Sequence, residues 1–349
     1  MKNNLNYTVF AIIFVFMSLI CLSQEVKKPY KPIGTSNNFF DNAETVKLSQ
    51  PYLTIEGEVK NPGKVDFSAI PLSSVIVKET VLSGDTIKFI GAYRYDGYSL
   101  LNILNNYIPD KINANEFPPL VDLYVEIENN KNEKVVFSWG EIYYPANLNS
   151  AIIATSVMRV IPEKTGEIWP MPADNKIVCS HDLISERNIT NPVKITVKSY
   201  KNDSIKIIKG KDPVYSPVMN IYSDNKKIKV IDSYPEKINQ KSIHTIFYGK
   251  GRGLHSTMPF EGIALSDCFV KLKPVSAKSI KNGLWIIVSD DGYRSVFTYS
   301  EICNRNDMAE AIINFNGENK NGGAFRLLVG FDYFSDRAVK SIRDVFYME

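Results

Sequence analysis

The sequence predicts an α+β fold of two tandem β-rich domains that follow an N-terminal signal peptide. The chain has 349 residues, which is longer than a single domain of ordinary size. One order of sequence motifs occurs twice along it, and in both copies strand patterns outnumber helix patterns. We therefore expect a first domain over residues 50–200 and a second over 201–349.

The N-terminus has the composition of a secretory signal. The apolar run Val9–Leu22 is shorter than the ~20 residues that a membrane-spanning helix needs. Small residues favour cleavage after Ser23, which gives a signal peptide over 1–23 and an extended leader over 24–49. An uncleaved anchor and a lipid anchor on Cys21 are the alternatives. We expect an exported protein, periplasmic or secreted, with no membrane span in the mature chain.

The overall composition is that of a folded globular protein. Hydrophobic residues make up 44% of the chain and charged residues 23%, and the formal net charge is +3. This near balance predicts neither nucleic acid nor an anionic bilayer as a partner. Because the sequence contains no Gly-x-Ser-x-Gly elbow, His-Glu-x-x-His motif or phosphate-binding P-loop, hydrolase, zinc-protease and nucleotide-hydrolysing functions have no motif in their favour.

The repeated segment sets the expected order of elements. In 95–104 and again in 260–269 an aromatic residue, an acid and a glycine lead into apolar residues at helical spacing, which predicts a glycine turn followed by a short helix. Two strands joined by a polar turn, then another short helix, are predicted over 123–142 and over 284–302. The spacing between matched landmarks shortens steadily along the chain, as expected for collinear copies with small insertions in the first.

The second copy carries a specific series of motifs. They are the glycine turn at Gly262 and Leu265, the turn Asp291-Gly292-Tyr293, and the segments 299–302, 323–329 and 337–340. This order resembles the molybdopterin-binding domain of sulfite-oxidase-like oxidoreductases, and the first copy, from Leu53 to Pro62, is similar to it more weakly. The resemblance implies a β-rich α+β fold with a cleft for a pterin phosphate.

The resemblance also implies a cysteine thiolate on molybdenum, and here the sequence departs from the family. The corresponding stretches, 243–260 and 80–95, contain no cysteine. Cys268 lies on the apolar side of the expected helix, so we predict a core position for it. We therefore predict no cofactor from the residues themselves, and molybdopterin is implied by the resemblance alone.

The two other cysteines of the expected mature chain have mainly structural interpretations. Cys303 follows the short helix of the second copy, and we expect it to be packed or neutral. Cys179 lies near His181 and Asp182, which could form the corner of a metal site. Chance proximity of these residue types in one loop is the alternative.

A glycine-rich basic segment is the first candidate binding site. Lys250, Arg252 and His255 lie among three glycines in Tyr248–His255. Glycines let backbone N–H groups approach an anion, while lysine and arginine supply charge and a planar pair of donors. The alternative is a flexible hairpin or loop with solvated charges.

Three further cations of the second domain complete the predicted site. The resemblance implies that Arg337 and Lys340 contact the phosphate of the pterin, and Arg326 matches an arginine of the family. Pairing of Arg326 with an acid such as Asp332 is the structural alternative. The first copy keeps Arg187 but not the lysine, so we expect the anion site in the second domain.

These observations predict an exported protein with a molybdopterin-oxidoreductase-like fold that lacks the metal-ligand cysteine. We expect it to bind an anionic small molecule or an envelope protein partner through the second domain. One alternative is an active molybdopterin-dependent oxidoreductase with an unusual ligand such as Cys268. Another is a structural scaffold of the cell envelope.

Overall fold

The computed structural model describes residues 40–233, 238–315 and 322–349, and these residues form a mostly β structure. Strands take up 43% of them and helices 12%, and four small sheets have a propeller-like arrangement. The expected α+β fold of two tandem sulfite-oxidase-like domains is therefore wrong. The physical reason is that the helices are single turns or little more, five to eight residues long, and too short to form a layer of their own.

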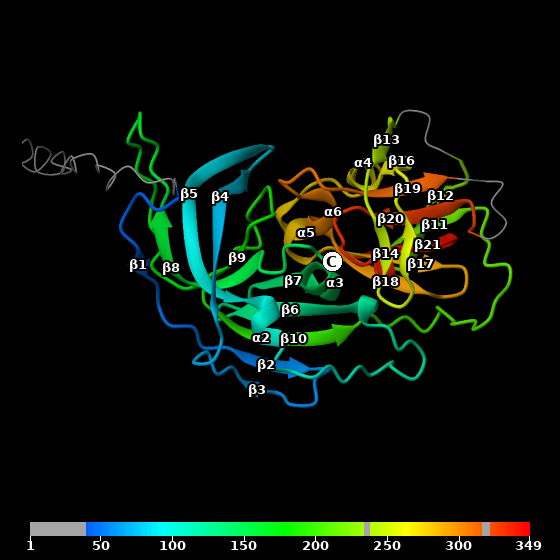
Figure 1. Ribbon diagram of the computed structural model, residues 1–349, viewed down its shortest axis with the longest axis horizontal. Helices are drawn as coiled ribbons and strands as arrows, with labels where there is room; N and C mark the ends of the chain where they lie inside the picture. The colour runs from blue at the N-terminus through cyan, green and yellow to red at the C-terminus, as the bar shows by residue number, and fades with distance from the viewer. Residues whose placement is uncertain (1–39, 234–237, 316–321) are drawn as a thin grey trace, which may run out of the picture.

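Two of the sheets are built from residues 46–199 (Figure 1). The first has the order β1-β8-β5-β4, with β9 paired to β8, and its strands are antiparallel. The second has the order β3-β2-β10-β6-β7, in which only β10 and β2 are parallel. The strands are β1 (Val46–Lys47), β2 (Thr54–Gly57), β3 (Gly63–Lys64), β4 (Leu72–Ser83), β5 (Thr86–Ser99), β6 (Leu123–Asn129), β7 (Lys134–Ser138), β8 (Ala151–Arg159), β9 (Lys176–Cys179) and β10 (Pro192–Ser199).

The other sheets are built from residues 219–348. One has the order β12-β11-β21-β17-β18, one has the order β13-β16-β19-β20, and β14 and β15 form a separate hairpin. The strands are β11 (Met219–Ser223), β12 (Lys226–Ile231), β13 (Gln240–Ile243), β14 (Phe247–Gly249), β15 (Gly253–Ser256), β16 (Phe260–Ala264), β17 (Leu284–Ser289), β18 (Arg294–Thr298), β19 (Ala311–Phe315), β20 (Phe325–Val329) and β21 (Ile342–Met348).

The same strand order occurs in both halves of the chain. In one sheet of each half an early strand pairs in parallel with the last strand of that half, and the last strand pairs antiparallel with a β-hairpin. In the first half β2 pairs with β10, and β10 pairs with the hairpin β6–β7. In the second half β11 pairs with β21, and β21 pairs with the hairpin β17–β18. The matched sequence segments 123–142 and 284–302 form the hairpin and a short helix in the two copies of this sheet. We call residues 50–200 the first half and 201–349 the second half, and these limits stay predictions. The predicted signal peptide over 1–23 and the predicted leader up to residue 39 lie outside the described residues.

Short helices begin where strands end, as the sequence predicts. Ser99, Ser138 and Thr298 each cap a helix by accepting a backbone N–H with the side-chain oxygen, which satisfies a donor that the first helical turn leaves free. The helices are α2 (Leu100–Leu104), α3 (Trp139–Tyr143), α4 (Leu265–Leu272), α5 (Ala277–Asn282) and α6 (Tyr299–Cys303), with 3₁₀ turns η1 (Leu120–Asp122) and η2 (Ser335–Arg337). Within the described ranges, none of the helices is long and apolar enough to cross a membrane.

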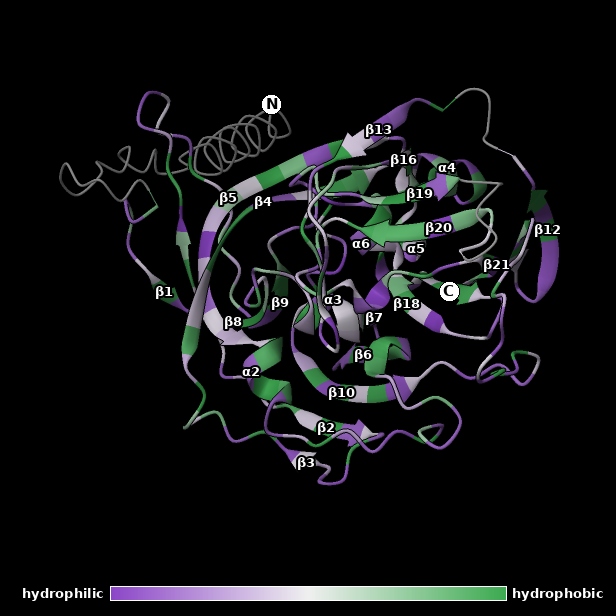
Figure 2. Ribbon diagram, turned by 45° about the vertical axis from the view of Figure 1, so that its right-hand side comes forward, coloured by the Kyte–Doolittle hydropathy of each residue, from purple (hydrophilic) through white to green (hydrophobic). Residues whose placement is uncertain are grey.

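Each half has its own apolar core. Alternate residues of β5 are buried, and the ribbon coloured by hydropathy changes along this strand (Figure 2), as expected for a strand with one face on a core. In the second half Phe269 stacks on Trp285 with ring centroids 3.9 Å apart, and both side chains are fully buried. Cys268 lies in the same core, which agrees with the position predicted for it.

The two halves meet through reciprocal backbone contacts. Tyr333 donates its N–H to the carbonyl of Tyr144, and Leu183 donates to the carbonyl of Asn304, each at 2.7 Å. Because each half places a loop against the end of a short helix in the other half, the residues near these contacts come from widely separated parts of the sequence.

Candidate anion-binding site

The hairpin β14–β15 carries the glycine-rich basic segment predicted from the sequence. Its turn contains Lys250 and Arg252, and the Lys250 backbone N–H donates to Asp336 Oδ2 at 3.0 Å. Gly249 allows close packing within the hairpin, since a Cβ at this position would lie 2.9 Å from His255 Nε2. The hairpin is thereby held against η2 of the second half.

A pocket of about 550 Å³ lies beside this hairpin. Four of the six residues predicted for the anion site line it: Arg252, His255, Arg326 and Lys340. They come from β15 and the turn before it, from β20, and from the segment after η2. The fold therefore brings together side chains that are up to 88 positions apart in the sequence, from Arg252 to Lys340. The other lining residues are Phe247, Gly249, Gly251, Ser256, Phe260, Tyr293, Ser335, Asp336 and Ala338.

Arg326 is the most informative residue of this pocket. It lies on β20 opposite Asn314, and its buried Nε atom has no hydrogen-bond partner in the part of the chain that the structure describes. Its guanidinium carbon lies 5.3 Å from the ring centroid of Phe247. Burial lowers the pKa of Arg326, but an arginine in a protein keeps its charge at neutral pH. The pocket therefore contains a partly desolvated cation with an unused donor.

The pocket has an excess of positive charge. Arg252, Arg326 and Lys340 face one carboxylate, that of Asp336, and this carboxylate already accepts the Lys250 N–H. Hydroxyl groups of Ser256 and Ser335, and the imidazole of His255, are further polar groups in the lining. This set of cations and neutral donors fits a phosphate, sulfate or carboxylate group.

The two remaining predicted residues lie elsewhere. Lys250 lines a neighbouring, mainly apolar pocket. Arg337 is fully buried, and its guanidinium donates to Asp332 at 2.6 and 2.7 Å and pairs with Glu301. Burial alone would lower the pKa of Arg337, but the two carboxylates raise it. Asp332 thus pairs with Arg337 and not, as the sequence alternative had it, with Arg326.

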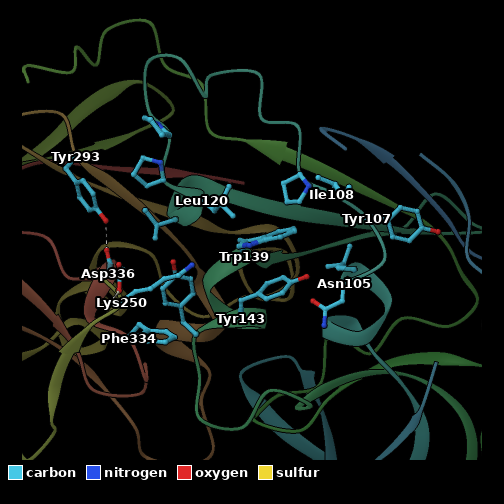
Figure 3. Close-up of a pocket in the computed structure, with 16 residues that line it drawn as sticks. Asn105, Tyr107, Ile108, Leu120, Trp139, Tyr143, Lys250, Tyr293, Phe334 and Asp336 are labelled. Carbon is cyan, nitrogen blue, oxygen red and sulfur yellow. Dashed lines mark hydrogen bonds between the residues drawn. The ribbon is translucent and has the colours of Figure 1, made fainter. Parts of the chain in front are cut away.

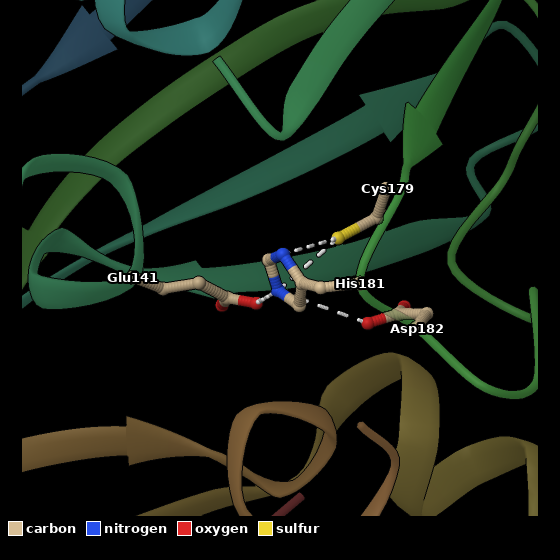
Figure 4. Close-up of side chains that lie close together, drawn as sticks. All are labelled: Glu141, Cys179, His181 and Asp182. Atoms are coloured by element: carbon tan, nitrogen blue, oxygen red, sulfur yellow. Dashed lines mark hydrogen bonds and ion pairs between the residues drawn. The ribbon is translucent and has the colours of Figure 1, made fainter. Parts of the chain in front are cut away.

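A second buried cluster lies in the first half, where the sequence indicated a metal corner. Cys179, His181 and Asp182 do come together, with ligand atoms within 4.8 Å of one another, and Glu141 joins them (Figure 4). His181 Nε2 lies 2.9 Å from Glu141 Oε1. Burial alone would lower the pKa of His181, but the adjacent Cys179 sulfur and Glu141 carboxylate raise it well above its ordinary value.

The guanidinium of Arg187 decides what this cluster can do. Its Nη2 atom lies 2.5 Å from Glu141 Oε1, 2.7 Å from Asp182 Oδ1 and 3.4 Å from Cys179 Sγ. A metal ion bound by the four residues of this cluster would have to displace the Arg187 guanidinium from three of them, Glu141, Asp182 and Cys179. Burial also raises the pKa of the Cys179 thiol, which disfavours the thiolate that a metal requires. The geometry therefore fits a buried ion network better than a metal site.

The second half contains the same network without the histidine and the cysteine. Glu301, Asp332 and Arg337 repeat the arrangement of Glu141, Asp182 and Arg187. The two networks are linked reciprocally, because Ser138 donates to Glu301 at 2.7 Å and Thr298 donates to Glu141 at 3.1 Å. Such a repeated arrangement is typical of a structural junction between halves.

The roles of Glu141 and Glu301 escaped the sequence analysis. Both are the fourth residue of a Ser/Thr-x-x-Glu segment, Ser138–Glu141 and Thr298–Glu301, which is the pattern of a helix capping box. This pattern was the available signal. It predicts a helix start but says nothing about the arginine that each glutamate also binds.

The residues of the basic pocket do not fit a molybdenum centre with a cysteine ligand. None of the residues that line it is a cysteine, and Cys268 is buried in the core, where burial raises the pKa of its thiol to about 11. The donor set therefore offers no thiolate to a metal in this pocket. Searches with protein-family models and among curated proteins find no match to this chain.

Proposed function

We propose that the protein binds an anionic ligand in the basic pocket of its second half, through Arg252, Arg326 and Lys340. One observation carries this proposal: among the described residues, the buried Nε of Arg326 has no hydrogen-bond partner, and it lies in a pocket where cations outnumber carboxylates. A buried charge that lacks a partner is costly. An incoming oxyanion would supply both the missing acceptor and the opposite charge.

The lining favours a doubly charged oxyanion over a single carboxylate. Three cations face one carboxylate, so the pocket has a formal charge of about +2 when His255 is neutral. A phosphate monoester or a divalent inorganic anion matches this charge, and the arginine side chains offer paired donors to two of its oxygens. Export of the protein and a partner in the cell envelope stay predictions from the sequence.

Titration calorimetry with inorganic phosphate at low ionic strength tests this function. We expect measurable binding that weakens as salt is added, because the pocket is partly open to solvent. Arg326→Gln should reduce the affinity about tenfold or more, the usual effect of losing a hydrogen bond to a charged group. Arg94→Gln is the matched control, since Arg94 is also a half-buried strand arginine but pairs with Asp41 and Asp96 outside the pocket.

Two results would contradict the proposal. One is the lack of any phosphate or sulfate binding by the folded wild-type protein. The other is an equal loss of affinity in Arg326→Gln and Arg94→Gln, which would indicate a general effect of charge and not a site.

A further inference from the structure

A second and larger pocket adjoins the anion site. Its volume is about 810 Å³, and Figure 3 shows side chains of both halves around it. Trp139 and Tyr143 stack with ring centroids 4.6 Å apart on one side of it. The only charged residues in its lining are Lys250 and Asp336. Apart from Asn105, its other walls are formed by apolar and aromatic residues, among them Leu104, Ile108, Leu120, Tyr144 and Phe334.

A ridge separates this apolar pocket from the basic pocket. Tyr293 and Asp336 line both pockets, and the Tyr293 hydroxyl donates to the Asp336 carbonyl at 2.5 Å. The turn of the β14–β15 hairpin also lies across the boundary, because Lys250 lines the apolar pocket and Arg252 the basic one. A ligand that fills both pockets must therefore pass over Tyr293 and Asp336.

A third pocket, of about 530 Å³, adjoins the basic one. It shares Tyr293, Ala338 and Lys340 with the basic pocket, and its further lining includes the carboxylates of Asp212 and Asp291. The three pockets thus meet at Tyr293, and the basic pocket shares more of its lining with the apolar and the acidic pocket than these two share with each other. Their chemistry complements a bulky apolar group, then an anion, then a cation.

We propose that these three pockets together bind an extended peptide segment that has an apolar side chain, then an acidic side chain, then a basic one. The proposal rests on the anion-binding function proposed above and names the class of partner. In an extended chain alternate side chains point the same way, about 7 Å apart, so the backbone can cross each ridge while its side chains enter separate pockets. A compact small molecule has no such need for three pockets of different chemistry.

The rim of the pockets has the composition of a protein interface. Tyr248 and Tyr333 are 40% and 59% exposed, and Phe334 lies between them and Tyr144. Exposed tyrosine and phenylalanine beside arginine are typical of surfaces that bind other proteins. These aromatic side chains can cover the backbone of a bound segment.

Fluorescence anisotropy with labelled synthetic peptides tests this inference on the full chain. The probes contain one phenylalanine, one glutamate and one lysine, separated by one, two or three glycines. Matched probes replace the phenylalanine by glycine or the glutamate by glutamine. We expect at least one spacing to bind about tenfold more tightly than both matched probes.

Two protein variants assign the binding to the pockets. Tyr143→Ala should remove the preference for phenylalanine and leave the affinity for inorganic phosphate unchanged. Ile108→Ser provides the same test at a side chain that is 58% exposed, where the substitution is not expected to impair folding. Arg326→Gln should weaken both peptide and phosphate, and Arg94→Gln should weaken neither.

The outcomes separate this inference from the function on which it rests. If phosphate binds through Arg326 but phenylalanine adds no affinity at any spacing, the peptide proposal is wrong and the anion site stands. If peptides bind with no difference between wild type and Ile108→Ser, the apolar pocket is not the peptide site and the proposal is again wrong. If neither phosphate nor the acidic peptides bind, both proposals fail.

Discussion

Replacing Gly140 by alanine is expected to break the buried ion pairs of Arg337. Gly140 lies in α3 of the first half, and a Cβ at this position would lie 2.3 Å from Cδ and 2.4 Å from Cζ of Arg337 in the second half. Ordinary contacts of a Cβ are 3.4–4 Å long, so the arginine side chain must move by about 1 Å. It has no free space to do so, because it is fully buried and fixed by Asp332, Glu301 and Ser138.

The expected cost follows from these contacts. Breaking a buried ion pair destabilises a protein by about 3–5 kcal/mol, whereas alanine improves on glycine by about 1 kcal/mol inside a helix. We therefore expect Gly140→Ala to lower the free energy of unfolding by about 2–4 kcal/mol. Gly251→Ala is the control, because a Cβ at Gly251 meets nothing within 4 Å.

Equilibrium unfolding in urea, followed by tryptophan fluorescence, measures both variants. The midpoint of Gly140→Ala should fall clearly below that of the wild type with an unchanged slope, while Gly251→Ala should stay within about 0.5 kcal/mol of it. A Gly140→Ala protein as stable as the control would show that Arg337 can move at no cost. The interpretation of this junction as a rigid ion network would then be wrong.

Three further predictions concern buried groups. The folded-state pKa of His181 is raised above 6.5, so protonated His181 should stabilise the protein fully below about pH 6.5 and lose this effect as the pH rises through the folded-state pKa. The melting temperatures of wild type and His181→Gln should therefore converge with rising pH. Parallel curves of melting temperature against pH would contradict this. Phe269→Ala should lower the free energy of unfolding, measured in urea, by about 3–5 kcal/mol and change the fluorescence emission of Trp285. A loss below about 1 kcal/mol would contradict the tight packing of Phe269 on Trp285. Alkylation of Cys268 at pH 8 should be slow until the protein unfolds, since burial raises its thiol pKa to about 11; rapid labelling of the native protein would refute this.

Much of the local structure could be predicted from the sequence. Two strands, a tight turn and a short helix lie at 123–143 and at 284–303, and α2 and α4 begin where they were predicted. The glycine turns predicted before these helices are wrong, because Gly97 and Gly262 lie within strands β5 and β16. The glycine-rich basic segment forms the hairpin that was one of its expected conformations. These features depend on alternation of apolar residues, on capping side chains and on turn residues, all of which act over a few positions.

The fold class could not be obtained in the same way. The helical patterns are real, but they extend over only five to eight residues, and only the assembled sheets show that such helices connect strands and form no layer. A resemblance of motif order therefore led to the wrong class. How small sheets pack depends on contacts between distant strands, which local patterns do not encode.

The sequence by itself determined which charged residues the second half offers, and the tertiary structure decided which of them remain available to a ligand. Arg326 and Arg337 both lie in β-rich sequence of the second copy and look alike as candidates. Packing of the halves places Arg337 between Asp332 and Glu301, whereas Arg326 has no acidic partner among residues 40–233, 238–315 and 322–349 and lies in a solvent-accessible pocket. The physical reason is that pairing of a buried charge depends on the position of side chains far away in the chain, and only the folded arrangement of the sheets fixes that position.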